Sequence, residues 1–286
     1  LVAGMRLTQR AKLNAAGVAT IEDLAAFEGS VRGMSPATLL KVQEQARLQV
    51  GQEERPKLAN GEPDVEAVVY DTVALEAMPA PDQGDIFFDF EGDPLWSDAD
   101  RSQWGLEYLF GLVEADTQEF HAFWAHDRQE EKQALIDFVD YVGARRVDHP
   151  RMHVYHYAPY EPTAIGRLMG RYATRETELD RILRAELFVD LYAVVRHSLK
   201  ASVESYSIKQ MEPFYAFTRG TPLADANSAL ANFQAHLELG DAPSIADDVK
   251  ATVRAYNEDD CRSAASLSAW LEALRTRLVA DGIDVP

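Results

Sequence analysis

A short hydrophobic stretch ending in two acids constrains this chain more than any other feature. Residues 85–91 read Asp-Ile-Phe-Phe-Asp-Phe-Glu, and the apolar run predicts a buried strand with Asp89 and Glu91 at its end. Side chains two apart on a strand point to the same face, so the two carboxylates are expected to converge. Adjacent anions repel unless a cation or proton compensates, and Mg²⁺ or Mn²⁺ prefers such oxygen ligands. A strand that runs into a solvated acidic turn is the alternative from this stretch alone.

The length and composition favour a cytoplasmic protein with one large domain, or a medium domain and a small companion. The chain has 286 residues, and no apolar run approaches the roughly 20 residues that span a bilayer. The first five residues, Leu-Val-Ala-Gly-Met, show no secretion signal. They also lack an initiator Met, which suggests a fragment of a longer protein.

The charge is acidic overall but unevenly distributed. The net charge is −19; residues 1–60 carry eight Lys/Arg against six Asp/Glu (+2), and the other 226 carry 20 against 41 (−21). An acidic metalloenzyme can still bind a phosphate backbone through a local groove, so charge alone does not decide for or against nucleic acid. The single cysteine, Cys261, excludes an internal disulfide framework and a Cys-based zinc cluster.

The N-terminal residues 1–57 are predicted to be helical. A periodic segment over residues 7–17 ends at Gly17, Thr20 and Asp23 form a capping-box pattern, and Ser35-Pro36 begins a further helix through about Val50. Short helices joined by Gly turns resemble a helix-hairpin-helix module, which presents backbone amides to a phosphate. A plain helical bundle is the alternative. Residues 58–84, rich in Pro, Gly and acid, are predicted to be a linker with an extended stretch at 65–73.

The main domain is predicted to span residues 85–286. We expect five strands and at least four helices, in an order that places three strands in succession before helix and strand alternate. The strands are 85–90, 106–113, 119–124, 153–157 and 187–189; the helices are 128–143, one beginning near Pro162, 223–239 and 245–280. This order predicts an α/β sheet that is antiparallel at one side and parallel at the other, flanked by helices.

Two further acids are candidates for the same site. Glu161 follows the strand at 153–157 and precedes Pro162, so it is expected near a helix N-terminus beyond the carboxyl end of a strand, where ligands collect in α/β sheets. Its alternative role is to complement the helix dipole. In the last helix, Tyr256 and Asp260 are four apart and share one face. Asp259 points about 100° away and is expected to be solvated.

The order and spacing of these motifs resemble those of a known enzyme superfamily. Asp-x-Glu on a first strand, an aromatic–acid pair after a later strand and Tyr-x-x-x-Asp near the end are similar to the tyrosine subtype of the DEDD 3′–5′ exonucleases, which have a ribonuclease H-like fold. Phe-Val-Asp-Leu-Tyr at 188–192 and Ser-Tyr-Ser-Ile-Lys at 205–209 resemble further segments of these nucleases. The segments 88–94, 156–161 and 256–261 look more closely like the YprB-type ribonuclease H-like domain, which occurs beside RecB-like nuclease and helicase domains in large bacterial proteins.

The resemblance covers about residues 85–275 and implies phosphodiester hydrolysis with two Mg²⁺ or Mn²⁺ ions. It implies that Asp89 bridges the ions, that Glu91 and Asp260 are further ligands, and that Glu161 supports the second ion. Tyr256 would orient the attacking water, because a phenol is a poor base at neutral pH. The superfamily has Asp where this chain has Glu161, and often Asn where it has His156. This departure from the superfamily pattern makes a weakened or inactive site the alternative to an active nuclease.

Several other side chains could contact nucleic acid. Tyr155, Tyr157 and Tyr160 could stack on a base, although aromatic residues beside a strand are more often core. Four basic residues could contact phosphate, with solvation at the surface as the alternative: Arg196, Lys200, Lys209 and Arg254. Asp190 is expected to be a helix N-cap or a residue that supports the metal ligands, and Asp93 in Gly-Asp-Pro is expected to shape a turn.

The leading hypothesis is therefore a metal-dependent 3′–5′ exonuclease, on DNA rather than RNA, that acts within a larger DNA-repair protein. Its expected partners are single-stranded or 3′-ended DNA and the neighbouring nuclease or helicase domains, with no membrane. A second hypothesis is a catalytically weak or inactive ribonuclease H-like module that binds nucleic acid or docks those domains. A structure-specific endonuclease on the same fold is a third.

Overall fold

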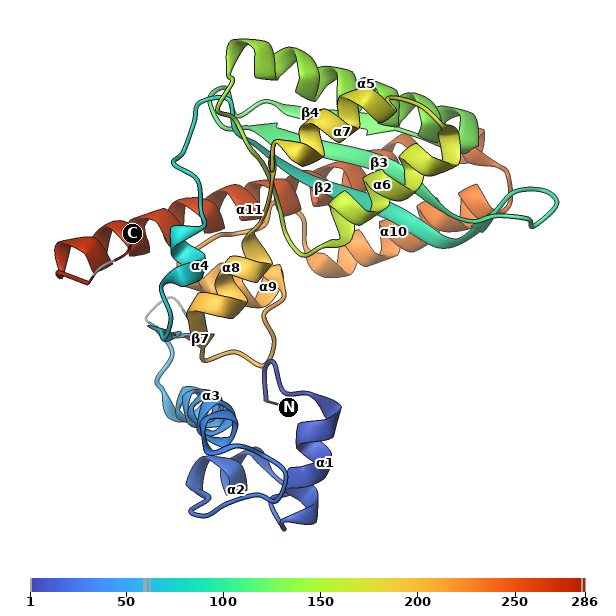
Figure 1. Cartoon of the computed structure of the whole chain (residues 1–286). Coiled ribbons are helices and arrows are strands. Elements are labelled where there is room, and N and C mark those ends of the chain that lie inside the picture. Colours follow the sequence, from blue (N-terminus) through green and yellow to red (C-terminus); the bar gives the residue numbers. More distant parts are fainter. Residues whose placement is uncertain (1, 59–60, 62, 284, 286) are drawn as a thin grey trace. The chain divides into compact units, whose positions relative to one another are not determined.

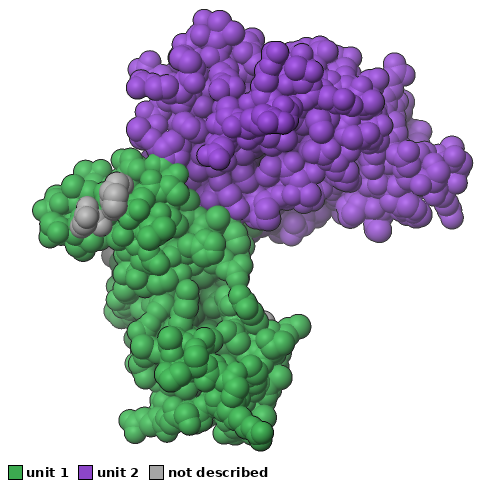
Figure 2. All heavy atoms as spheres, viewed as in Figure 1, with its two compact units in different colours: residues 1–78, 192–217, 270–286 green, residues 79–191, 218–269 purple. Residues whose placement is uncertain are grey.

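The chain forms two compact units. A computed structural model describes residues 2–58, 61, 63–283 and 285. Unit 1 comprises residues 1–78, 192–217 and 270–286, and unit 2 comprises residues 79–191 and 218–269 (Figure 2). The predicted division into 1–57, 58–84 and 85–286 stays a prediction. Residues 1, 59–60 and 62, which belong to its first two segments, lie outside the described residues.

Unit 2 is built on a mixed five-stranded sheet. The strands are β2 (Ile86–Ser97), β3 (Trp104–Glu114), β4 (Phe120–Trp124), β5 (Val154–His156) and β6 (Phe188–Asp190). Their order in the sheet is β4-β3-β2-β5-β6 (Figure 1). The pairs β2–β3 and β3–β4 are antiparallel, and the pairs β2–β5 and β5–β6 are parallel. The predicted α/β sheet, antiparallel at one side and parallel at the other, is confirmed.

The central strand β2 is twice as long as predicted. The sequence predicts an end near Phe90, but the strand continues to Ser97, so Asp89 and Glu91 lie in its middle. Two shifts of register against β3, at Glu91/Gly92 and between Asp93 and Ser97, accommodate the Gly-Asp-Pro segment. Asp93 was expected to shape a turn but lies within the strand, where its Oδ1 accepts the Leu95 N–H at 2.8 Å.

Helices cover both faces of this sheet (Figure 1). On one face, α5 (Arg128–Asp148), α6 (Tyr160–Tyr172) and α7 (Glu176–Arg184) pack on apolar side chains of the strands. Phe88 of β2 stacks on Phe138 of α5 with ring centroids 4.2 Å apart. On the other face, α10 (Leu223–Glu238) and α11 (Asp247–Ala280) pack on β3, and Tyr108 lies 4.8 Å from Phe233. A 3₁₀ turn, η2 (Ala242–Ser244), joins these two helices.

Unit 1 begins with the three predicted helices. They are α1 (Leu7–Ala15), α2 (Ile21–Ala26) and α3 (Pro36–Glu54), and they share an apolar core. The capping box at Thr20 and Asp23 is present. Smaller elements complete the unit: β1 (Ala67–Val69), α4 (Val73–Glu76), most of α8 (Leu191–Ser198), β7 (Leu199–Ala201), α9 (Ile208–Met211) and η1 (Glu212–Tyr215). Strands β1 and β7 pair antiparallel, so the predicted linker contains a strand and a short helix.

Across the described ranges, none of the helices combines the length and the apolar character that a bilayer crossing requires.

A buried carboxylate joins α5, α6 and β3. Glu131 is fully buried, and one carboxylate oxygen accepts the Glu107 N–H at 2.6 Å. The other oxygen lies 3.1 Å from Arg128 and 3.2 Å from Arg171, and also accepts the Tyr172 hydroxyl. One buried carboxylate therefore pairs with two arginines and accepts one backbone N–H. Its removal would leave these groups without that partner in the interior of the protein.

Glu131→Ala should lower the free energy of unfolding by about 3–5 kcal/mol, because it leaves buried cations without their anion. Urea denaturation measures the change. The control is Lys132→Ala on the exposed side of the same helix, for which a change within about 0.5 kcal/mol is expected. Equal effects of the two substitutions would contradict the role assigned to Glu131.

Candidate metal centre on the central strand

The two acids of β2 face the side of the sheet that α11 covers. Phe88 and Phe90 alternate with them and belong to the core on the opposite face, as the two-residue period of a strand requires. Asp89 and Glu91 are half-buried. Because β2 has β3 on one side and β5 on the other, the pair lies at the centre of the sheet.

The last helix brings the third predicted acid to the same place. Asp260 lies in α11 and is 8% exposed. One carboxylate oxygen from each of Asp89, Glu91 and Asp260 lies within 4.8 Å of the others. Of the five residues predicted for the site, these three are thus brought together as metal-ligand spacing requires.

Asn257, which the sequence reasoning did not single out, links α11 to the two acids of β2. It is fully buried, and its Nδ2 donates to Oδ2 of Asp89 at 3.1 Å and lies 3.4 Å from Oε1 of Glu91. A second contact reaches the Asp89 carbonyl at 3.4 Å. The amide therefore holds the two carboxylates apart and partly offsets their repulsion without adding charge.

A glycine makes this approach of helix to sheet possible. Gly111 of β3 pairs with Asp89 in the sheet register, and an added Cβ would lie 1.6 Å from Oδ1 of Asn257. The next turn of the helix contacts the same residue, since the Cys261 thiol donates to the Gly111 carbonyl at 3.4 Å. Only glycine leaves room for α11 to reach the acids of β2.

An arginine supplies a positive charge beside the third acid. Arg219 donates from Nη2 to Oδ1 of Asp260 at 2.5 Å, and both side chains are about nine-tenths buried. Its guanidinium also lies 5.6 Å from the ring centroid of Tyr256, within the range of a cation–π contact. Arg219 thus connects the predicted water-orienting tyrosine with a predicted metal ligand.

The neighbouring acid fixes the loop that carries Arg219. Asp259 was expected to be solvated, but it is 8% exposed. Its carboxylate accepts the N–H groups of Gly220 and Thr221 at 3.1 and 2.9 Å. Asp259 is not among the three grouped carboxylates. The prediction that it is solvated is wrong, because its buried carboxylate holds this loop against α11.

Two tyrosines border the carboxylates. Tyr256 lies one helical turn before Asp260 and is 9% exposed. Tyr108 of β3 is fully buried, and burial raises its pKa, with the Glu91 carboxylate as the next cause. Its hydroxyl therefore keeps its proton at physiological pH.

Glu161 lies beside a histidine and outside the three-carboxylate group. It lies in the first turn of α6 and is 3% exposed, and its Oε2 is 3.3 Å from Nδ1 of His156. The same Nδ1 lies 2.6 Å from the Ala158 carbonyl. Because both neighbours are acceptors, Nδ1 carries the proton. It donates this proton to the nearer Ala158 carbonyl, and Oε2 of Glu161 is buried without a hydrogen-bond partner among the described residues. Glu161 is not among the carboxylates within 4.8 Å of one another.

The loop between β5 and α6 is strained and tightly held. Ala158 has a φ of 80°, in the left-handed region that disfavours residues other than glycine. Its N–H donates to Oδ1 of Asp190 at 3.0 Å, while its carbonyl faces His156. Asp190, at the end of β6, thereby shapes the turn that presents Glu161.

Two of the tyrosines predicted to stack on a base differ in exposure. Tyr155 is buried in the core, whereas Tyr160 is 51% exposed.

The donor set fits divalent metal ions. Three carboxylates from two elements converge, and the hard oxygen ligands are those that Mg²⁺ and Mn²⁺ prefer. Asn257 orients two of them, as hydrogen-bonding groups behind metal ligands do. The protein is therefore an α/β protein whose central strand and covering helix together offer three carboxylates to a divalent ion.

The family follows from the comparison with known proteins. Residues 86–272 match the model of the RNase_H superfamily, and the chain belongs to this superfamily. Its members are generally nucleases that use divalent metals and act on nucleic acid. No curated protein and no solved structure gave a match.

A second group of potential ligands is already engaged in the fold. Glu114, Glu119 and His121 also have ligand atoms within 4.8 Å of one another. However, the Glu114 carboxylate contacts His121 and Arg145 at 3.1 Å each and accepts the Tyr141 hydroxyl. These contacts make Glu114 part of a structural network between β3, β4 and α5.

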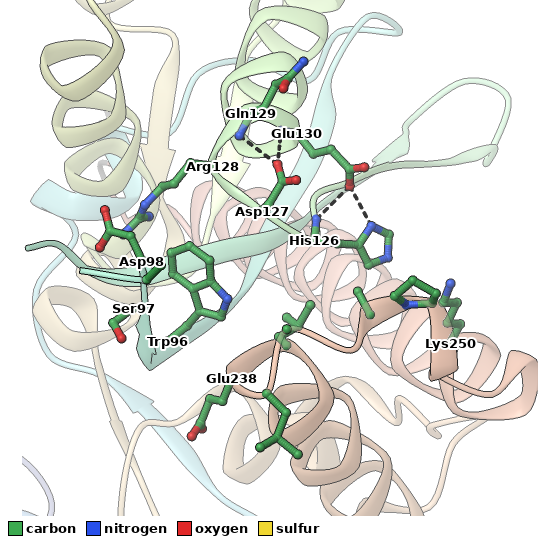
Figure 3. A pocket seen from close by; sticks show the side chains of 16 residues that line it. Trp96, Ser97, Asp98, His126, Asp127, Arg128, Gln129, Glu130, Glu238 and Lys250 are labelled. Carbon is green, nitrogen blue, oxygen red and sulfur yellow. Dashed lines mark hydrogen bonds and ion pairs between the residues drawn. The ribbon is translucent and has the colours of Figure 1, made fainter. Parts of the chain in front are cut away.

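A hollow of unit 2 lies apart from the predicted residues. It has a volume of about 820 Å³, and Figure 3 shows the Trp96 indole and the Arg128 side chain at one wall, with His126 and Lys250 farther along. The Arg128 guanidinium lies 4.6 Å from the Trp96 ring. None of the five predicted site residues lines this hollow.

Gly111→Ala should disrupt the centre, because its Cβ would overlap Oδ1 of Asn257. We expect a loss of about 1–3 kcal/mol in the free energy of unfolding and weaker Mn²⁺ binding. Urea denaturation and calorimetric titration with Mn²⁺ measure the two effects. Gly143→Ala, on α5 where a Cβ meets nothing within 4 Å, is the control and should be neutral or stabilising. Unchanged Mn²⁺ binding in Gly111→Ala would contradict this role of Asn257.

Proposed function

We propose that this protein is a metal-dependent 3′–5′ exonuclease that hydrolyses phosphodiester bonds of nucleic acid, with DNA preferred over RNA. The class of reaction accords with the superfamily, while the polarity and the preference for DNA come from the resemblance of its motifs to the DEDD exonucleases. The same resemblance supports action on single-stranded or 3′-ended DNA, within a larger DNA-processing protein.

One observation carries the proposal: carboxylate oxygens of Asp89, Glu91 and Asp260 lie within 4.8 Å of one another. Three anions at this spacing destabilise a fold unless cations compensate them. Arg219 and Asn257 supply one positive charge and one amide beside them. Divalent ions bound by these carboxylates would add further positive charge.

In this proposal, Asp89, Glu91 and Asp260 hold two Mg²⁺ or Mn²⁺ ions, and Glu161 supports the second. Bound ions would supply a hydroxide nucleophile and stabilise the leaving 3′ oxygen. Tyr256 orients the attacking water through its hydroxyl, because a phenol with a pKa near 10 is a hydrogen-bonding partner rather than a base. Burial of Tyr256 beside Arg219 fixes the ring for this role.

Arg219 gives the site a fixed positive charge next to the reacting groups. Its Nη2 reaches Asp260, and the Asp259 clamp holds its loop in place. A guanidinium in a buried setting attracts phosphate oxygens strongly. In the proposed reaction, Arg219 orients Asp260 and offsets negative charge that accumulates on the phosphate.

A second candidate function is a catalytically weak module that binds nucleic acid or docks neighbouring domains. The observation that favours it is the buried ion pair between Arg219 and Asp260, one of the predicted ligands. If this pair persists in the presence of metal, binding of an ion to Asp260 is impaired. Metal binding and cleavage separate the two functions.

Asp89→Asn and Asp260→Asn should each reduce cleavage by at least about a hundredfold, since loss of even an outer partner of a metal ligand costs about 10–100-fold. The assay follows 5′-labelled single- and double-stranded DNA and RNA with Mg²⁺ or Mn²⁺. We expect shortening from the 3′ end by the wild-type protein. Glu258→Gln, which changes an acid of the same helical turn that pairs with Arg254 and Arg262, is the control for general damage to α11.

The same proteins are examined for Mn²⁺-dependent thermal stabilisation. We expect stabilisation of the wild-type protein and a much smaller effect in Asp89→Asn. Stabilisation without cleavage would favour the binding module, and cutting of a circular substrate would indicate an endonuclease. Cleavage that survives in both variants would place the chemistry elsewhere.

Glu161→Gln should reduce cleavage less than Asp89→Asn does, because Glu161 lies outside the three-carboxylate group and contacts His156. Glu161→Asp restores the residue of the wider superfamily and tests whether the longer side chain limits activity. The comparison of kcat and Mn²⁺ affinity for the three variants checks this order. Equal losses for Glu161→Gln and Asp89→Asn would show that Glu161 is a full ligand.

A further inference from the structure

A basic hollow in unit 1 stands out against the acidic composition of the chain. It has a volume of about 330 Å³ and is lined by fourteen described residues, none of which is Asp or Glu. Its charged members are Arg6, Lys41, Arg196 and Lys200, joined by His197. We call these five residues and Tyr70 the basic pocket. Four permanent positive charges gather here in a chain whose net charge is −19.

Tyr70 organises the pocket. The Lys41 ammonium donates to its hydroxyl oxygen at 3.1 Å, and the hydroxyl donates to the Arg196 carbonyl at 2.8 Å. The ammonium groups of Lys41 and Lys200 lie 4.4 and 5.2 Å from the centroid of the same ring. The two ammonium groups are therefore positioned by one aromatic side chain before any ligand binds.

The charges need an anion. Two ammonium groups beside one ring repel each other, and Lys200 is 7% exposed, where an unneutralised charge is costly. Glu44 forms an ion pair with Lys200, which offsets one of the four charges. A net charge of +3 remains around the hollow, and the first turns of α1 and α3 add the positive ends of two helix dipoles.

We infer that the basic pocket binds phosphate groups of a nucleic-acid strand. Lysine and arginine together, with aromatic side chains and polar Gln9 and Thr38 at the wall, are the groups that hold phosphodiesters and stack on sugars or bases. The inference rests on the proposed function for the identity of the polyanion. It adds a binding site in unit 1, separate from the carboxylates of unit 2.

Arg196 and Lys200 illustrate what the fold adds to the sequence. They were candidates for phosphate contacts, with solvation as the alternative. The turn from α8 into β7 places them together, and α3 and the residue after β1 bring Lys41 and Tyr70 to them. Lys209 and Arg254, the other two candidates, do not line the pocket.

The test is the double substitution Lys41→Gln with Arg196→Gln in the 286-residue chain carrying Asp89→Asn, studied in EDTA so that cleavage plays no part. Fluorescence anisotropy with a labelled single-stranded DNA measures affinity at several salt concentrations. We expect binding to weaken by about tenfold or more. We also expect the slope of log K against log salt to fall in magnitude by about 1.4, the loss of two phosphate contacts on a single strand.

Two variants serve as controls. Arg32→Ala with Lys57→Ala removes the same charge from exposed positions of unit 1 outside the pocket, and should leave affinity within about twofold. Lys41→Arg with Arg196→Lys keeps the charge and should retain binding. Thermal denaturation verifies that each protein is folded. Unchanged affinity and slope in the glutamine variant, or an equal loss in the exposed control, would overturn the inference.

Inorganic phosphate provides a separate arm. If phosphate stabilises the parent protein but not the glutamine variant, while both bind DNA equally, the pocket takes a small phosphate compound and the nucleic-acid assignment is overturned. Because cleavage is absent from these measurements, failure of the proposed exonuclease activity would not be mistaken for failure of the pocket.

Discussion

The repulsion between carboxylates on the central strand is the constraint around which unit 2 is arranged. Asp89 and Glu91 face α11, the helix that carries Asp260. The neighbouring contacts offset the repulsion between these three carboxylates. Asn257 donates to the first two acids, Arg219 pairs with the third, and Gly111 leaves the space that these contacts need. The alternating Phe88 and Phe90 anchor the strand on its opposite face, so the acids cannot move apart without loss of core packing.

The helix α11 supplies the other residues of the site, and neighbouring residues of one turn contact different partners. Asn257 faces the strand acids, Asp259 clamps the loop of Arg219, and Asp260 completes the carboxylate group. A run of acids on a helix is ordinarily a solvated face. Here burial on two sides of the helix gives each acid its own partner, and the helical period determines which partner that is.

Much of the fold could be predicted from the sequence, because strand alternation, capping residues and glycine stops act locally. The acids on β2 and Asp260 were found from their spacing. The continuation of β2 beyond Glu91 could not be predicted, since pairing with β3 overrides the Gly-Asp-Pro signal through shifts of register. Asn257 and Arg219 were missed because only tertiary packing brings them to the acids. For Asn257, the available signal was its position three residues before Asp260, which places both residues on one face of the helix.

The lone cysteine has a practical consequence. Cys261 is fully buried beneath the carboxylates, and burial, followed by the charges of Asp89 and Asp260, raises the pKa of its thiol. A thiol that keeps its proton and is shielded from solvent reacts slowly with maleimides and with oxidants. Spectroscopic probes can therefore be attached to cysteines introduced at the surface while Cys261 stays in place. The native chain is thus a ready background for distance measurements between labelled sites.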